Sequence, residues 1–235
     1  MNIFITGASS GIGYQTALQF ARTGAHRIVV VARNEEKLLQ LKKDCEFQGA
    51  GATVYPIVIN LRSPNLTIIK ETMRSIVGGL DVVINNAGFL VNKPFAAITA
   101  EELRESYEVN VQAPFLLTQM LLPFLRKGNN PQIVNIGSMG GVNATAKFKG
   151  LSAYSSSKGA LSILSECLAE ELKEEGIRVN CLALGSVNTE MLKRAFPGYE
   201  ANHEAADMAE FIVNFIEQTS SFFNGKTIQV SSTTP

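Results

Sequence analysis

The sequence has no excess of charge of either sign. Its 21 basic and 21 acidic residues give a formal net charge of zero at pH 7, and no run of like charges occurs. Nucleic acids and anionic membranes attract concentrated positive charge, so we expect no surface for either partner. The partners that remain are small molecules.

Long hydrophobic runs are also missing. A membrane-spanning helix needs roughly 20 consecutive apolar residues, and no run in the chain reaches that length. A strand-like pattern begins at Asn2, which leaves no room for a cleaved leader before it. We therefore expect a cytoplasmic protein without a membrane segment.

Cysteine is scarce, with only Cys45, Cys167 and Cys181. The three show neither a paired motif nor the spacing of metal ligands, so no metal site is predicted. Cys167 and Cys181 fall within apolar helix and strand patterns, where burial is the usual outcome. A reactive-thiol role is not expected.

No linker, internal repeat or low-complexity stretch divides the 235 residues, of which 46% are hydrophobic. Short Val- and Ile-rich runs alternate with helical periodicity, which predicts an α/β fold with a doubly wound, seven-stranded parallel sheet and helices on both faces. We expect a single domain over residues 1–235. The predicted strands are Asn2–Thr6, Arg27–Ala32, Thr53–Val58, Asp81–Asn85, Gln132–Gly137, Arg178–Ala183 and Lys226–Val230. The predicted helices are Gly13–Thr23, Glu35–Phe47, Asn65–Val77, Ala100–Leu125, Ala153–Glu175 and Ala205–Gln218.

Tyr154 and Lys158 lie four residues apart in a predicted helix, which places the phenol and the ammonium on one face. Tyrosine titrates at about 10, so it is a poor proton donor near neutral pH unless a nearby positive charge stabilises the phenolate. The spacing therefore indicates an acid–base pair. Taken alone, it also fits an exposed tyrosine and lysine that share a helix face by coincidence.

A second motif supports the first. The apolar strand at the N-terminus runs into Gly7-Ala8-Ser9-Ser10-Gly11-Ile12-Gly13 and then into a helix. Glycines at such a turn let the backbone approach a phosphate, and the helix offers unpaired N–H groups and the positive end of its dipole. The spacing is Gly-x-x-x-Gly-x-Gly, which differs from the Gly-x-Gly-x-x-Gly of the standard dinucleotide fingerprint.

With both motifs in view, the chain resembles the classical short-chain dehydrogenases/reductases over nearly all of its length. Four further segments match in family order. They are Asn85–Gly88, Asn110 within Tyr107–Val111, Ser138 at the end of Ile133–Ser138, and Gly185–Thr189. Each segment is weak alone, whereas six motifs in order are specific. The resemblance implies an NAD(P)-binding Rossmann-fold oxidoreductase.

The resemblance also implies a catalytic set of Asn110, Ser138, Tyr154 and Lys158. Tyr154 would exchange a proton with the substrate oxygen as hydride moves to or from the nicotinamide. Lys158 would lower the pKa of Tyr154 and bind the nicotinamide ribose. Ser138 would hydrogen-bond the substrate oxygen, and Asn110 would support a water-linked proton path to Lys158. From the residues alone, Ser138 also fits a hydroxyl that satisfies a strand end, and Asn110 fits an unfavourable mid-helix amide.

The implied cofactor-binding residues follow the glycine turn, the strand ends and the Tyr154 helix. They are Gly7, Ser9, Ser10, Gly11, Ile12, Gly13, Arg33, Asn60, Leu61, Asn86, Ala87, Gly88, Tyr154, Lys158, Gly185, Val187 and Thr189. Asn60 replaces an aspartate that is usual in the family. Its amide can still donate and accept toward an adenine edge.

The end of the second strand predicts which cofactor is used. An NAD enzyme usually carries an acidic residue there for the ribose 2′-hydroxyl, whereas this chain has Ala32 and Arg33. A guanidinium can hold a 2′-phosphate, so NADP(H) is favoured over NAD(H). Arg33 could instead point into solvent, and Ser10 stands where some NADP-preferring relatives have a second basic residue.

The favoured function is an NADP(H)-dependent reductase of a ketone or aldehyde, acting between a carbonyl and a secondary alcohol. An NAD-dependent alcohol dehydrogenase and a catalytically dormant nucleotide-binding regulatory protein are the alternatives. Met191, Leu192 and Phe196 form a short segment that favours a substrate with apolar surface. The helices Ala100–Leu125 and Ala153–Glu175 carry more apolar residues than one buried face needs, which predicts a homodimer or homotetramer.

Overall fold

The computed structural model describes residues 1–48 and 50–232, and it contains one seven-stranded sheet. The strand order is β3-β2-β1-β4-β5-β6-β7, and every pairing is parallel. The strands are β1 (Asn2–Thr6), β2 (Arg27–Ala32), β3 (Thr53–Val58), β4 (Val82–Asn85), β5 (Gln132–Ser138), β6 (Arg178–Leu184) and β7 (Thr227–Val230). The predicted doubly wound parallel sheet is confirmed, and each predicted strand end lies within one residue of the observed one.

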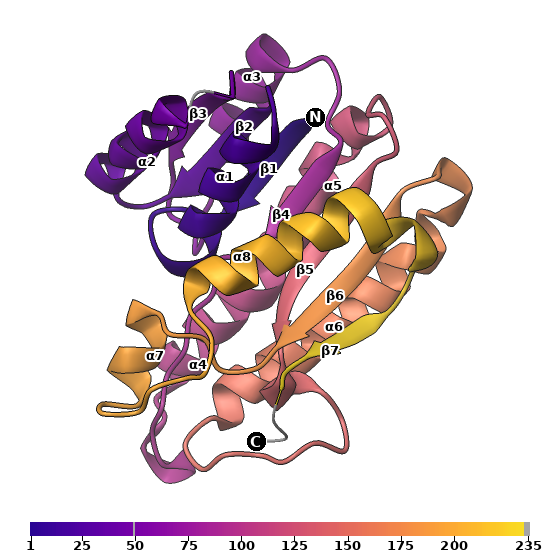
Figure 1. Ribbon diagram of the computed structural model, residues 1–235. Coiled ribbons are helices and arrows are strands. Elements are labelled where there is room, and N and C mark those ends of the chain that lie inside the picture. The colour runs from indigo at the N-terminus through magenta and orange to yellow at the C-terminus, as the bar shows by residue number, and fades with distance from the viewer. Residues whose placement is uncertain (49, 233–235) are drawn as a thin grey trace.

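Helices cover both faces of the sheet (Figure 1). One face carries α1 (Gly11–Thr23), α2 (Glu35–Phe47) and α8 (Ala205–Asn214), and the other carries α3 (Leu66–Ile76), α5 (Ala113–Leu125) and α6 (Ser152–Glu171). Alternating residues of β1 supply the two cores, with Ile3 and Ile5 on the α1 side and Phe4 on the α5 side. The sheet is therefore buried on both faces, which explains its continuous Val- and Ile-rich strands.

The prediction of a single helix over Ala100–Leu125 is wrong. The structure has α4 (Ala100–Tyr107), a π-turn over Glu108–Gln112 and then α5. Pro114 explains the interruption, because it has no N–H to donate to the carbonyl of Asn110 four residues earlier and its ring crowds that carbonyl. A proline within the first turn of α5 is tolerated, since that position needs no intrahelical N–H bond.

The remaining differences lie at helix ends. The predicted helix Ala205–Gln218 continues from α8 into a π-turn over Phe215–Thr219, and α6 is followed by a 3₁₀ turn over Lys173–Glu175. A short helix, α7 (Glu190–Ala195), forms in the segment after β6 for which no helix was predicted. None of the helices in the described part of the chain is both long and apolar enough to cross a membrane.

The strand order reverses between β1 and β4, which are neighbours in the sheet although β2 and β3 lie between them in sequence. Ligands of open parallel sheets bind at such a point, outside the carboxyl ends of the strands. The loops after β1, β4, β5 and β6 and the short helix α7 gather at this edge (Figure 1). The fold therefore brings the sequence motifs to one side of the molecule.

Candidate active site

The turn between β1 and α1 requires glycine. Gly7 has a φ of +68°, in the left-handed region, and its N–H donates to the Val31 carbonyl at 2.8 Å. A β-carbon on Gly7 would lie 2.7 Å from the Ala87 Cα, and one on Gly13 would overlap the Asn86 amide. Neither position has room for a side chain, so only glycine lets this turn pack closely against Asn86 and Ala87.

Asn86 binds the glycine turn to the end of β4. Its Nδ2 donates to the carbonyls of Thr6 at 3.0 Å and Gly7 at 3.2 Å. The Thr6 hydroxyl oxygen in turn accepts from the backbone N–H groups of Asn86 and Ala87, both at 3.0 Å. These four bonds fix the two strand ends on either side of the point where the strand order reverses.

The N-terminus of α1 fits an anion. Ser10 is the N-cap residue, yet its side chain makes no capping hydrogen bond, and the first turn carries no acidic residue. The first N–H groups of this helix and the positive end of its dipole therefore face the glycine turn without a competing side-chain partner. Ser9 and Ile12 are partly buried in the same turn. A pyrophosphate suits this arrangement of donors.

Arg33, directly after β2, carries a guanidinium that no described carboxylate pairs with. Arg33 is exposed, and the ion pairs of the described residues do not include it. The next residue, Asn34, caps α2 by accepting from the Lys37 N–H at 2.8 Å. Arg33 thus directly precedes the N-cap of α2, and its guanidinium has no carboxylate partner among the described ion pairs.

Asn60 and Leu61 after β3 have different surroundings. Asn60 is exposed, and its Oδ1 accepts from the Arg62 N–H at 3.1 Å, which shapes the local turn. Leu61 is only 7% exposed and packs into the core on the α5 side. Of this pair, Asn60 presents its side chain and Leu61 mainly supports the loop.

Lys158 is a buried ammonium on α6. It is 3% exposed, and its Nζ donates to the Ile136 carbonyl at 2.7 Å and lies 5.9 Å from the centroid of the Tyr154 ring. Burial lowers the pKa of Lys158 to about 8, and the nearby thiol of Cys181 opposes this shift weakly. The pKa of the Lys158 ammonium is therefore closer to neutral pH than that of an ordinary lysine.

Tyr154 and Ser138 face each other across the site. Burial of the phenol raises the pKa of Tyr154, and a hydrogen bond with the Ser138 hydroxyl partly offsets that rise. Ser138 ends β5, and its Oγ accepts from the Gly140 N–H at 3.2 Å. A β-carbon on Gly141 would lie 2.6 Å from the Lys158 backbone carbon, so the turn after β5 packs directly on α6.

Asn110 is fully buried in the π-turn. Its Oδ1 accepts from the Phe89 N–H at 2.8 Å, and its Nδ2 donates to the Phe89 carbonyl and to Ser157 Oγ, both at 2.9 Å. The amide has satisfied partners on two separate elements, which explains how a mid-helix asparagine is tolerated.

Side chains from three elements meet around Gly88, which follows the end of β4. A β-carbon on Gly88 would lie 3.5 Å from Asn110 Oδ1, 3.6 Å from the Met191 methyl carbon and 3.7 Å from Lys158 Nζ. Three groups from the π-turn, α7 and α6 therefore surround one point at the end of β4. Met191 is the apolar member of this set.

The loop after β6 closes the other side. Thr189 caps α7 by accepting from the Leu192 N–H at 3.2 Å, and its methyl carbon would be 3.3 Å from a β-carbon on Gly11. Val187 is buried in the core on the α1 side. Lys37 Nζ lies 3.3 Å from Glu190 Oε1, so α7 is also joined to the N-terminal turn of α2.

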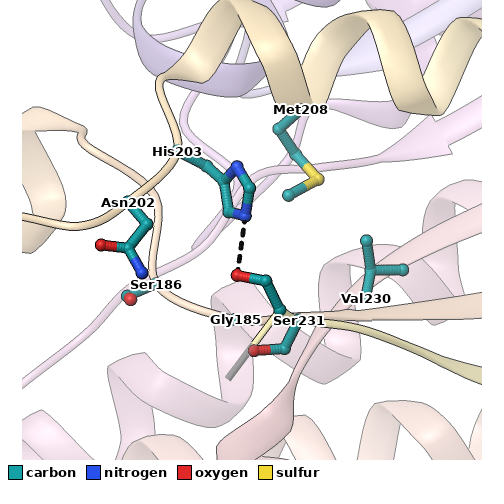
Figure 2. A pocket seen from close by; sticks show the side chains of 8 residues that line it. Gly185, Ser186, Asn202, His203, Met208, Val230 and Ser231 are labelled. Atoms are coloured by element: carbon teal, nitrogen blue, oxygen red, sulfur yellow. Dashed lines mark hydrogen bonds between the residues drawn. The ribbon is translucent and has the colours of Figure 1, made fainter. Parts of the chain in front are cut away.

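Gly185 lies at a separate small pocket shown in Figure 2, where His203 Nε2 is 3.0 Å from Ser232 Oγ. The cavity volume is about 10 Å³, which holds roughly one water molecule. A β-carbon on Gly185 would lie 2.6 Å from Ser231 Oγ, so this glycine allows the end of β7 to approach the loop. Tyr154 and Lys158 do not line this pocket.

Cys167 is exposed, which corrects the expectation that it is buried. Cys45 and Cys181 are buried, and burial raises the pKa of both thiols, whereas Cys167 is exposed on α6. Cys167 lies one helical turn after the exposed Ile163, on the side of α6 that faces away from the sheet. Among the residues that the structure describes, no group of three or more His, Cys, Asp or Glu is placed to hold a metal ion.

A family model described as short chain dehydrogenase matches residues 1–200 of this chain. The chain belongs to that family. The glycine turn, the β4 and β5 ends and the Tyr154 helix all lie inside the matched range.

Individual relatives are similar over most of their length. The 3-oxoacyl-(acyl-carrier-protein) reductase of Thermotoga maritima is 34% identical over 193 residues, which are 81% of this chain and 75% of the relative. The L-xylulose reductase of Caenorhabditis elegans is 34% identical over 80% of this chain and 72% of the relative. A short chain dehydrogenase from Shigella flexneri, solved in complex with NADP, superposes with a TM-score of 0.89 at 29% identity, covering 97% of this chain and 95% of that one.

Within this family fold, the structure brings together most of the residues predicted for the site. Tyr154 meets Ser138, Lys158 and Asn110 surround Gly88, and Asn86 contacts Gly7. Arg33 and Asn60 lie on the surface at the ends of β2 and β3, on the other side of the glycine turn.

Sequence reasoning missed three residues of the site. Thr6 supplies the hydroxyl that joins β1 to β4, and its position as the last residue of the first strand was the available signal. Pro114 marked the interruption beside Asn110. Ser157 gave no signal, because nothing in a serine-rich helix shows which hydroxyl will meet a distant amide.

Proposed function

We propose that this protein is an NADP(H)-dependent reductase of ketones or aldehydes, with Tyr154 as the proton donor. The single observation that carries the proposal is the cluster in which the partly buried Tyr154 phenol contacts Ser138 while the buried Lys158 lies 5.9 Å from the centroid of its ring. Both hydroxyls can approach one substrate oxygen, and a buried ammonium one helical turn away favours a phenolate once the proton has left.

The residues of the glycine turn fit a dinucleotide, which would supply the hydride. Gly7, Gly11 and Gly13 let the turn pack closely against Asn86, Ala87 and Thr189, and the N-terminus of α1 offers its N–H groups to a pyrophosphate. Asn86, Ala87 and Gly88 would border the nicotinamide end, with Val187 and Thr189 from the loop after β6. Ser9, Ser10, Ile12, Asn60, Leu61 and Gly185 complete the proposed cofactor-binding residues.

Each catalytic side chain has a distinct task in this proposal. Ser138 donates a hydrogen bond to the substrate oxygen and stabilises negative charge as it develops. Tyr154 gives its proton to that oxygen. Lys158 holds the ribose and stabilises the phenolate that forms when the proton has left. The hydrogen bond with Ser138 opposes the rise in the Tyr154 pKa that burial causes. Asn110 supports a proton path from solvent to Lys158.

Arg33 supports the preference for NADP(H). Its guanidinium has no carboxylate partner among the described ion pairs, and Ala32 before it cannot repel a 2′-phosphate. The Shigella flexneri relative was solved with NADP, and the Thermotoga maritima and Caenorhabditis elegans relatives are named as reductases. A single domain over residues 1–235, a homo-oligomeric state and a cytoplasmic location are part of the same proposal.

A panel of ketones and aldehydes tests the proposal. The purified protein is assayed with NADPH and with NADH, following the loss of nicotinamide absorbance, and each rate is compared with that of the Tyr154→Phe variant. We expect turnover of at least one carbonyl with apolar substituents, faster with NADPH and lost in the variant. Turnover that persists in Tyr154→Phe would contradict the role of Tyr154 as the proton donor. Equal turnover with NADPH and NADH would contradict the preference for NADP(H).

A further inference from the structure

The side-chain amide of Asn110 is completely paired, and its three bonds divide unequally between two elements. Phe89, in the loop after β4, takes two of them through its N–H and its carbonyl. Only the third bond, from Asn110 Nδ2 to Ser157 Oγ at 2.9 Å, reaches α6, which carries Tyr154 and Lys158. Among the residues that the structure describes, Ser157 is therefore the one side chain that links the Asn110 amide to that helix.

The direction of the Ser157 bonds is fixed by proton count. A serine hydroxyl has one proton to donate, and Ser157 Oγ donates it to the Tyr154 carbonyl at 2.7 Å. The oxygen is then left to accept from Asn110 Nδ2. Both Ser157 and Asn110 are fully buried, so water cannot replace either partner at low cost.

We infer that Ser157 is a positioning residue, which fixes the Asn110 amide relative to the backbone of Tyr154. This inference rests on the proposed function, since it assigns Ser157 a role in the same site. Ser157 acts through Asn110 and the Tyr154 carbonyl, and its hydrogen bonds reach neither the phenol nor the ammonium. Without the hydroxyl, the π-turn loses its polar contact with α6, and the Asn110 amide can rotate or shift away from Lys158.

The same helix offers a matched control. Ser165 is also fully buried, its Oγ donates to the Leu161 carbonyl at 2.7 Å, and it accepts from Asn135 Nδ2 at 2.8 Å. Ser157 and Ser165 therefore make the same two kinds of bond, to a preceding helix carbonyl and from a buried asparagine. They differ in that Asn135 lies on β5, away from the π-turn, so a purely structural role predicts equal effects for the two positions.

The kinetic experiment compares Ser157→Ala with Ser165→Ala in the whole protein. We expect a similar loss of thermal stability in both variants, because each leaves a buried amide N–H without its acceptor. We expect kcat to fall about tenfold only in Ser157→Ala, with KM and the NADPH dissociation constant changed less than about twofold. An equal kcat for the two variants would overturn the inference. Ser157→Cys and Ser165→Cys, which keep a side chain of similar shape but a weak acceptor, repeat the comparison if an alanine variant does not fold.

A measurement that needs no turnover separates this inference from the proposed function. The side-chain amide protons of Asn110 are followed by ¹⁵N NMR, with their signals identified by their absence in Asn110→Ala. We expect faster hydrogen exchange of these protons in Ser157→Ala and unchanged exchange in Ser165→Ala. If the protein reduces no carbonyl, the proposed function fails. The exchange measurement still shows whether Ser157 holds the Asn110 amide in place. Unchanged exchange in Ser157→Ala would show that Phe89 alone holds Asn110.

Discussion

The Lys158 ammonium donates a 2.7 Å hydrogen bond to the Ile136 carbonyl from a buried position, since the residue is only 3% exposed. A carbonyl is a neutral acceptor, and the ion pairs of the described residues do not include Lys158. This is the reason that burial lowers the pKa of Lys158 to about 8. The fold thus tolerates an unfavourable charge at the centre of its candidate site.

The lowered pKa of Lys158 predicts that the folded protein becomes more stable at alkaline pH. Its pKa is lower in the folded chain than the ordinary 10.5, so the unfolded chain binds more protons between about pH 8 and pH 10.5. The free energy of unfolding therefore increases across this window, by up to about 3 kcal/mol from this group. Urea unfolding of the wild type and of Lys158→Met, measured from pH 7 to pH 10.5, checks it. The wild type should gain stability relative to the variant as the pH rises, and parallel curves would contradict the prediction.

Tyr154→Phe removes the proposed proton donor and little else. We expect turnover to fall by at least the roughly 10²–10⁴-fold that general acid catalysis contributes, while NADPH binds nearly as well as to the wild type. Steady-state rates and cofactor titration by fluorescence measure the two quantities. Tyr55→Phe, at a partly buried tyrosine on β3, serves as the control and should keep its rate. Near-full activity in Tyr154→Phe would mean that the proton comes from another group.

Arg33→Ala tests the choice of cofactor. A charge-assisted hydrogen bond contributes about 1.5–3 kcal/mol, so the KM for NADPH should rise by roughly 10- to 150-fold while that for NADH changes little. Arg27 gives a matched control, because it is an exposed arginine at the opposite end of the same strand β2. Arg27→Ala should leave both constants unchanged. An equal rise for both cofactors in Arg33→Ala would remove the argument for a 2′-phosphate contact.

The outer faces of α5 and α6 predict an oligomer. Phe115 is 47% exposed and Ile163 is 59% exposed, and a groove of about 320 Å³ is lined by Val111, Gln112, Phe115 and Leu116. Light scattering should give a mass that is a multiple of the 25.4 kDa of one chain, and Phe115→Glu should reduce it by placing a charge in the contact. Phe47→Glu, at an exposed position on α2, should leave the mass unchanged. A wild-type mass near 25.4 kDa would exclude the oligomer.

The strands and the Tyr154 helix were predictable because their signals are local. The run Arg27–Ala32 is apolar at every position after the first, which is typical of a strand buried on both faces. A cluster of glycines between a strand and a helix indicates a turn that a side chain would obstruct. The pairing of Tyr154 with Lys158 needs nothing beyond helical spacing. These features therefore appear in the sequence without knowledge of the packing.

The rest depended on contacts between distant residues. The exposure of Cys167 follows from which side of α6 the sheet covers, and an apolar pattern spread around the helix did not decide it. The direction of the Tyr154 pKa shift depends on the burial of the phenol, which the sequence does not give. The contact of Ser157 with Asn110 joins residues 47 positions apart, and no local pattern predicts it.

The π-turn at Glu108–Gln112 also determines which side of α5 faces the core. Each residue of an α-helix advances by about 100°, and a π-turn absorbs one additional residue, so α5 is rotated by about that angle from a straight continuation of α4. The same rotation accompanies an inward-facing Asn110 and an outward-facing Phe115. Deletion of the additional residue would therefore rotate Phe115 by about 100° relative to α4, so the inner and outer surfaces of this helix depend on the same turn.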